Sequence, residues 1–176
     1  MLSYQHGYHA GNMADVHKHA LLAWMLGYLT QKDKPLSYIE THAGRGLYRL
    51  DAPEALKTGE AAAGIGRARG LGWFAAEHPY AGALAKVRAA HGAAAYPGSP
   101  LVAEAFLRAG DRMVLAELHP KEHAALAEVM GGRAQVLKED GAKMALRQVP
   151  PDPKRGLMLI DPSYEIKGDY EAAAKL

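Results

Sequence analysis

The sequence contains no cysteine and only two tryptophans and two phenylalanines among its 176 residues. The absence of cysteine excludes disulfide bonds, thiolate nucleophiles and cysteine-ligated zinc, and it suits a reducing compartment. The longest apolar run, residues 20–29, is about half of the ~20 residues that a membrane-spanning helix needs. The segment from Met1 to Ala10 lacks the basic start and apolar run of a signal peptide. These absences predict a soluble, cytoplasmic protein.

An excess of charge of either sign is also missing. The formal net charge is +2, and 23% of the residues are charged while 49% are hydrophobic, as in an ordinary globular protein. So small a net charge neither indicates nor excludes binding to nucleic acid. A chain of this length can form one domain with a hydrophobic core and is short for two.

Strands and helices alternate in the C-terminal half of the sequence. Strands are predicted at residues 113–117, 134–138 and 156–160, with helices between them at 121–130 and 142–148. An earlier apolar run at residues 36–41 enters a glycine turn and is predicted to be a fourth strand. This alternation is typical of an α/β domain with a parallel sheet, which binds its ligands beyond the carboxyl ends of the strands.

Two further segments are predicted to be helical. Asn12 or Asp15 can begin a helix that continues to Leu29, and the polar segment that ends in Pro35 should stop it. Residues 51–96 are rich in alanine and glycine and contain no strand-like run, so we interpret them as a helical insertion subdomain, followed by another helix at 101–107. The core domain would then comprise residues 1–50 and 97–176.

Each predicted strand ends at residues that can bind a ligand. Gly44 and Gly46 follow the first strand and would let the backbone approach a ligand closely, although a plain structural turn is the simpler interpretation of these glycines taken alone. Glu117 can accept hydrogen bonds from both hydroxyls of a ribose. Asp140 can accept one from an adenine amine, and Gly141 would leave room for the ring.

The fourth strand ends in the most informative tetrapeptide, residues 161–164. Asp161 and the Pro162 carbonyl offer two neighbouring acceptors to one amino group. Tyr164 offers an aromatic face on which a base can stack.

Together, Glu40 with the glycine turn, Glu117, Asp140-Gly141 and the segment 161–164 resemble the motifs of Rossmann-like methyltransferases that modify the exocyclic amine of adenine. More narrowly, nearly the whole chain resembles the RlmJ family, most specifically in residues 1–19, 41–44, 96–100 and 117–120. Members of that family use S-adenosyl-L-methionine to methylate the N6 amine of one adenine, adenine 2030, in bacterial 23S ribosomal RNA. The resemblance therefore implies the Rossmann-like α/β methyltransferase fold and a cytoplasmic monomer that binds 23S ribosomal RNA and no membrane.

The resemblance also implies roles for individual residues. Asp161 would be the catalytic acceptor, and no metal would be needed. The cofactor would be held by His19, His42, Gly44, Ser99, Glu117, Asp140 and Gly141. The substrate base or the RNA backbone would lie near Tyr4, His6, Lys18, Pro162 and Tyr164.

Two departures from the family pattern stand out. Ser163 replaces a second proline that family members usually have, so the loop loses a fixed φ angle and gains an N–H group. In addition, only four strands of a seven-stranded fold are found, which would leave the strand of Asp161 at an exposed sheet edge. Either the sequence is a piece of a longer protein or the chain pairs with another partner, and the sequence leaves both open.

The histidines raise the possibility of a metal-dependent hydrolase, since five of the nine lie within the first 42 residues. On a helix, His17 and His19 point about 200° apart and cannot bind one ion together. Asp15 and His19 share a helix face, but a hydrogen bond within the helix explains that pair more simply.

Two further interpretations of the sequence are a nicotinamide-dependent dehydrogenase and a binding domain without catalytic activity. In a nicotinamide-dependent dehydrogenase the ribose-binding acid follows the glycine turn by about 20 residues, whereas Glu117 follows Gly44 by about 70. A domain that binds RNA or S-adenosylmethionine without catalysing transfer stays open. Six basic residues would attract phosphate or form ordinary solvated surface, namely Lys18, Arg45, Arg49, Lys57, Arg67 and Arg69.

Overall fold

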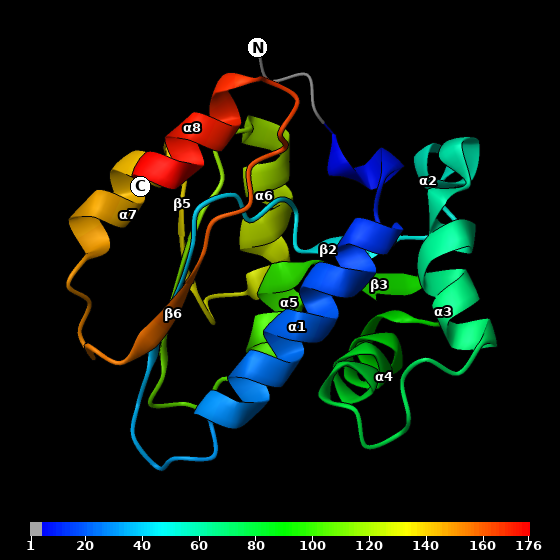
Figure 1. Ribbon diagram of the computed structural model, residues 1–176, viewed down its shortest axis with the longest axis horizontal. Helices are drawn as coiled ribbons and strands as arrows, with labels where there is room; N and C mark the ends of the chain where they lie inside the picture. The colour runs from blue at the N-terminus through cyan, green and yellow to red at the C-terminus, as the bar shows by residue number, and fades with distance from the viewer. Residues whose placement is uncertain (1–4) are drawn as a thin grey trace. The chain divides into compact units, whose positions relative to one another are not determined.

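A computed structural model describes residues 5–176 and divides them into two compact units (Figure 1). The sheet unit comprises residues 34–45 and 108–176, and the helical unit comprises residues 5–33 and 46–107. The helical unit thus takes in more of the chain than the predicted insertion at 51–96, whose boundaries stay a prediction.

The sheet unit contains a parallel four-stranded sheet with the order β5-β4-β1-β6. The strands are β1 (Ser37–Glu40), β4 (Arg112–Ala116), β5 (Gln135–Leu137) and β6 (Gly156–Leu159). Ser37 of β1 is in register with Arg112 of β4 on one side and with Gly156 of β6 on the other. The predicted α/β class with a parallel sheet is confirmed, and each strand lies within one residue of its predicted bounds.

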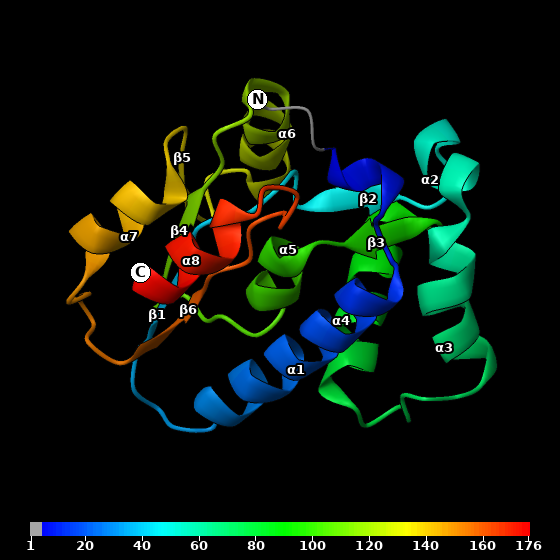
Figure 2. The same ribbon diagram turned by 45° about the horizontal axis from the view of Figure 1, so that its top comes forward.

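Three helices accompany this sheet: α6 (Pro120–Met130), α7 (Gly141–Gln148) and α8 (Gly168–Lys175). The chain crosses the sheet in one direction from β4 to β5 and in the other from β5 to β6. Right-handed crossovers therefore place α6 and α7 on opposite faces of the sheet, as Figures 1 and 2 show. The sequence predicted α6 and α7 but not α8.

The apolar core explains why β1 lies in the middle of the sheet. All four of its residues are buried, as expected for a strand that has neighbours on both edges and helices on both faces. Ile39 packs with Val114, Ala116 and Met144, which come from β4 and α7. The outer strands β5 and β6 are more exposed.

The helical unit is built around α1 (Met13–Leu29). Asn12 is its N-cap, because the Asn12 side chain accepts a 2.9 Å hydrogen bond from the Asp15 backbone amide. The helix ends at Leu29, where the Thr30 hydroxyl donates to the Leu26 carbonyl at 2.8 Å, well before Pro35. The predicted helix is confirmed, but Pro35 is not what ends it.

The remaining elements of the helical unit are short, apart from α4. They are η1 (His6–Tyr8), β2 (Leu47–Arg49), α2 (Pro53–Thr58), the π-helical η2 (Ala62–Gly66), α3 (Arg67–Gly70), α4 (Pro79–His91), β3 (Ala95–Pro97) and α5 (Ser99–Glu104). Strands β2 and β3 pair antiparallel, which the sequence did not predict, since three residues are too few for a periodic pattern. None of the helices among residues 5–176 is long and apolar enough to cross a membrane.

Candidate functional site

The candidate site lies at the carboxyl edge of the parallel sheet. Because β1, β4, β5 and β6 run in the same direction, the loops that follow them leave the sheet at one edge. The structure thereby brings together eight predicted site residues of the sheet unit: His42, Gly44, Glu117, Asp140, Gly141, Asp161, Pro162 and Tyr164.

Glu117 ties two of these loops together. Its Oε2 accepts a 2.8 Å hydrogen bond from the Gly44 backbone amide, and its Oε1 accepts a 2.7 Å bond from the His119 amide. Gly44 has a φ of +61°, a conformation that favours glycine. A carboxylate has about four acceptor positions, so Glu117 can still accept hydrogen bonds from ligand hydroxyls.

Arg45, next to this turn, anchors it to α6. Its Nε and Nη2 donate to the two carboxylate oxygens of Glu122 at 2.8 Å and 2.7 Å, and Glu122 is buried. Such a two-point pairing fixes the guanidinium in orientation as well as in position. Arg45 was considered as a phosphate-attracting residue, but the structure shows it in this ion pair, which supports the glycine turn.

The beginning of α7 packs closely against the loop that follows β1. Asp140 is the N-cap of α7, and its Oδ1 accepts a 2.9 Å hydrogen bond from the Lys143 amide. A Cβ atom at Gly141 would lie only 1.9 Å from the Thr41 carbonyl oxygen. The structural reason for glycine here is therefore the Thr41 backbone, and the proposed room for an adenine ring stays a prediction.

His42 lies among the acids of this edge. The Thr41 hydroxyl and the His42 Nδ1 are 2.7 Å apart, which fixes the imidazole although its side chain is solvent-exposed. Partial desolvation lowers the pKa of His42, and four carboxylates act in the opposite direction, those of Glu117, Asp161, Asp140 and Asp169. Three predicted ligand-binding acids therefore act on one imidazole.

Asp161 follows β6 and is half-buried. On the neighbouring β1, the buried Tyr38 hydroxyl donates to the buried Glu40 carboxylate at 2.8 Å. Burial, Glu40 and Asp161 together raise the pKa of Tyr38 well above its usual value, so its hydroxyl stays protonated. Glu40 belongs to the motif recognised in the sequence, but its hydrogen bond with Tyr38 was not predicted, because Tyr38 stands in no recognisable motif.

Tyr164 has an unusual backbone conformation and an aromatic neighbour. Its φ is +57°, which is rare for a bulky side chain and marks a locally constrained loop. Its ring centroid is 4.6 Å from that of Tyr170 on α8, with 37° between the ring planes. The side chain is 38% exposed, so it can still contact another ring. Tyr170 was missed because α8 was not predicted.

Other predicted residues gather around Asp15 in the helical unit. The buried Asp15 Oδ2 lies 2.8 Å from His6 Nε2 and accepts a 2.9 Å bond from the Gly11 amide, and Oδ1 lies 3.2 Å from Lys18 Nζ. Burial would raise the pKa of Asp15, but His19, His6 and Lys18 lower it well below its usual value. The expected hydrogen bond between Asp15 and His19 is wrong, because Asp15 Oδ1 and His19 Nε2 are 4.0 Å apart.

His19 is buried in an aromatic environment. Its Nδ1 lies 3.1 Å from the Tyr96 hydroxyl, which is 3.0 Å from that of Tyr80. Its Nε2 has no hydrogen-bond partner among residues 5–176. Burial lowers the pKa of His19 to about 3, against the influence of Asp15, so the imidazole is neutral at physiological pH. A polar group of a ligand could satisfy this nitrogen.

Three further residues discussed in the sequence analysis are Ser99, Tyr4 and His17. Ser99 is buried at the first residue of α5, and Tyr4 lies outside the described residues. His17 is exposed on α1, on the face opposite the buried His19. Among residues 5–176, no three His, Asp or Glu side chains are grouped so that they could hold a metal ion.

Comparison with known proteins decides which family this is. A family model described as "Ribosomal RNA large subunit methyltransferase D, RlmJ" matches residues 33–175. The chain belongs to the RlmJ family. The resemblance seen in the sequence is thereby confirmed.

Individual RlmJ relatives agree along nearly the entire chain. A protein of Escherichia coli (strain K12) named "Ribosomal RNA large subunit methyltransferase J" is 42% identical over 98% of this chain. The protein of the same name from Haemophilus influenzae (strain ATCC 51907 / DSM 11121 / KW20 / Rd) is 40% identical over 99%. The chain spans 62% and 64% of the lengths of these two relatives.

A solved structure supports the RlmJ fold. The crystal structure of a DUF519-family protein from Legionella pneumophila str. Philadelphia 1 is 38% identical and superimposes with a TM-score of 0.83. The match covers 95% of this chain and 62% of that one.

Proposed function

We propose that this chain binds S-adenosyl-L-methionine and transfers its methyl group to the N6 amine of one adenine in 23S ribosomal RNA, the family's adenine 2030. The single observation that best supports this is the position of Glu117, Asp140 and Asp161 directly after β4, β5 and β6 at one edge of the parallel sheet, where Glu117 also holds the Gly44 turn that follows β1. Membership of the RlmJ family makes methyl transfer to ribosomal RNA the chemistry to test at this edge.

The residues at the sheet edge fit this cofactor. Glu117 retains acceptor positions for ribose hydroxyls, and it already holds the glycine turn in place. Asp140 is exposed beside the first turn of α7, where its carboxylate can accept a hydrogen bond from an adenine amine. When bound, S-adenosylmethionine supplies an electrophilic methyl group. The cofactor roles of His19 and Ser99 stay predictions.

Asp161 and Pro162 would act on the target amine. The lone pair of an adenine amine is delocalised into the ring, so the amine is a poor nucleophile. Hydrogen bonds from its two N–H groups to the Asp161 carboxylate and the Pro162 carbonyl would turn that lone pair towards the methyl group. The Asp161 carboxylate would also stabilise the positive charge that develops on the nitrogen.

Tyr164 would hold the base. An adenine must leave its helical stack before its amine can enter a protein site, and aromatic side chains then support it. Tyr170 already contacts one part of the Tyr164 ring. The adenine would therefore stack on the exposed part of Tyr164 or displace Tyr170. His6 and Lys18 are proposed to contact the RNA, and Asp15 fixes both side chains.

The first experiment is a calorimetric titration of the purified chain with S-adenosylhomocysteine. Micromolar binding that Glu117→Ala abolishes and Glu128→Ala preserves would support the cofactor site, since Glu128 is exposed on α6 of the same unit. Absence of binding to a chain that circular dichroism shows to be folded would contradict it.

Methyl transfer is tested separately with labelled S-adenosylmethionine and unmethylated 23S ribosomal RNA. Incorporation at N6 of a single adenine is expected from a monomeric chain. Cofactor binding without transfer would contradict the catalytic proposal and favour a domain that binds cofactor or RNA without turnover.

A further inference from the structure

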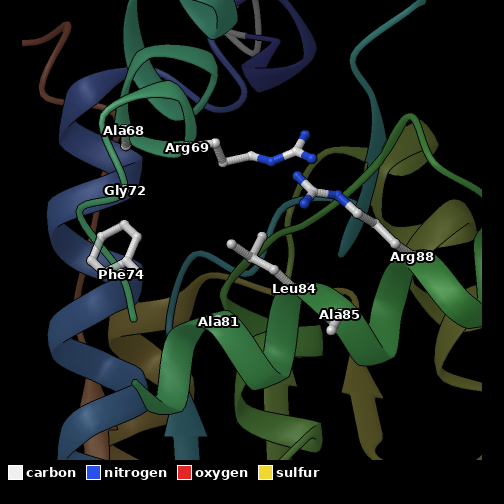
Figure 3. A pocket seen from close by; sticks show the side chains of 8 residues that line it. All are labelled: Ala68, Arg69, Gly72, Phe74, Ala81, Leu84, Ala85 and Arg88. Carbon is white, nitrogen blue, oxygen red and sulfur yellow. The ribbon is translucent and has the colours of Figure 1, made fainter. Parts of the chain in front are cut away.

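A small pocket in the helical unit lies between α3 and α4, and its lining includes Arg69, one of the six basic residues that the sequence marks as candidates to attract phosphate. Its volume is about 240 Å³, and Phe74, Leu84 and Ala85 form much of its apolar wall. Figure 3 shows the side chains of Arg69 and Arg88 extending towards each other across the pocket. Pockets that bind ligands of drug size have volumes of roughly 300–1,000 Å³. The pocket therefore suits a single small group better than a nucleoside.

Arg88 is incompletely satisfied in this pocket. Its Nε and Nη2 atoms are buried and have no hydrogen-bond partner among residues 5–176. Buried donors of a charged group are costly to leave unpaired, and most such groups in proteins have a protein, water or ion partner. The unpaired nitrogens therefore indicate that a ligand belongs beside them.

Arg69 adds a second positive charge at the same place. Desolvation and the charge of Arg69 both lower the pKa of Arg88. Two guanidinium groups that face each other repel, and an anion between them turns that repulsion into attraction. Arg69 itself is exposed, so an anion can reach the pair from solvent.

Four arginines elsewhere in the chain do have acidic partners. Arg45 pairs with Glu122, Arg49 with Asp51, Arg108 with Asp111, and Arg147 with Glu139. Residues 62–92 hold four Lys and Arg residues but a single acid, Glu77, which leaves 17 basic and 18 acidic residues elsewhere. The positive charge of the chain is therefore concentrated in the segment that forms this pocket.

We propose that the pocket binds one phosphate group of the RNA backbone, with the half-buried Arg88 as the anchor and the exposed Arg69 as the second contact. Guanidinium groups match phosphate oxygens with two parallel hydrogen bonds, which lysine cannot do. A contact of this kind positions an RNA without reading its sequence. The choice of RNA as the source of the phosphate rests on the function proposed above.

The test measures RNA affinity of the full chain by fluorescence anisotropy at several salt concentrations. The variants are Arg69→Gln and Arg88→Gln, and Arg67→Gln is the matched control, because Arg67 is also exposed on α3 but does not line the pocket. Each pocket variant should weaken binding of a 23S ribosomal RNA fragment by about tenfold. The slope of log affinity against log salt should fall by about 0.7–0.9 for the lost phosphate contact. Arg88→Lys should show an intermediate loss.

Affinities and slopes of both pocket variants that equal those of Arg67→Gln would overturn the proposal. Titration with inorganic phosphate distinguishes a free phosphate ion from a phosphate of RNA. If inorganic phosphate binds at the pocket while the variants keep their RNA affinity, the site takes a free anion and the RNA assignment is wrong. Arg69 is exposed, so its replacement tests the proposal even if Arg88→Gln fails to fold. Binding of S-adenosylhomocysteine should be unchanged in both variants, and its absence in the unmodified chain would contradict the cofactor proposal alone.

Discussion

The backbone amide of Gly44 donates a 2.8 Å hydrogen bond to Glu117, so a single carboxylate joins the loops that follow β1 and β4. The second oxygen of Glu117 holds its own loop through the His119 amide. A side chain proposed to bind the ribose therefore also shapes the turn beside it. Replacing it should disturb both contacts at once.

Glu117→Gln tests this double role with little change in size. The amide offers one carbonyl oxygen, so one of the two backbone N–H groups loses its acceptor. Loss of a hydrogen bond to a charged group costs about 1.5–3 kcal/mol, and we expect S-adenosylhomocysteine to bind about tenfold to 100-fold more weakly in calorimetry. Glu128→Gln should keep the original affinity. An unchanged affinity in Glu117→Gln would remove Glu117 from the site.

Gly141→Ala should destabilise the chain. The added Cβ would meet the Thr41 carbonyl at 1.9 Å, so α7 or the loop after β1 must move. Overpacking of this kind costs roughly 1–3 kcal/mol, measured as a lower midpoint in urea unfolding. Gly168→Ala is the control, because a Cβ there meets no atom within 4 Å. Equal stability of the two variants would show that α7 adjusts without cost.

Asp161→Ala should abolish methyl transfer and leave cofactor binding nearly intact, because the acid is proposed to face the target amine. Asp161→Asn keeps the size of the side chain but not its charge, and a fall in kcat of about 100-fold to 1,000-fold is expected for the loss of one such stabilising group. Glu165→Ala, an exposed acid of the same segment, should stay active. Turnover by Asp161→Ala at the original rate would refute the catalytic assignment.

His19 should make the stability of the chain depend on pH. The pKa of His19 is about 3 in the folded chain and 6.5 without the influence of the fold. Between these pH values, His19 therefore carries a proton in the unfolded chain but not in the folded chain. Its contribution to stability is therefore complete above pH 6.5 and is lost as the pH falls from 6.5 towards 3. The slope from one proton reaches about 1.4 kcal/mol per pH unit.

Urea unfolding between pH 5 and 7, above the titration of Asp15, measures this slope. His19→Gln should flatten the profile relative to the original chain, whereas His17→Gln, on the exposed side of the same helix, should keep it. Parallel profiles for His19→Gln and the original chain would mean that folding does not lower the pKa of His19.

The parallel sheet could be predicted because its strands are apolar runs that end in distinctive residues. The same reasoning placed Glu117, Asp140 and Asp161 at one edge, since parallel strands share their carboxyl ends. Strands β2 and β3 could not be found, because three residues show no period and their pairing joins residues far apart in the sequence.

Contacts across the fold were equally invisible in the sequence. Arg45 pairs with Glu122, which is 77 residues away in the sequence. The sequence around either residue contains no pattern that predicts this pair. The histidine-rich opening identified the family, but only the structure shows that Asp15 gathers His6 and Lys18 around it. The sequence suggested that Gly141 leaves room for a ligand, whereas in the structure the Thr41 backbone carbonyl leaves no room for a Cβ atom at this position.

The central position of β1 has a consequence during synthesis. Its residues leave the ribosome early, yet its partner strand β4 follows about 75 residues later. At roughly 5–20 residues per second, about 4–15 s pass before the parallel sheet can begin to form. The segment made in that interval, residues 46–107, belongs to the helical unit, whose short-range helical contacts can form as it emerges. The parallel sheet that bears the candidate site is therefore expected to form after the helical unit.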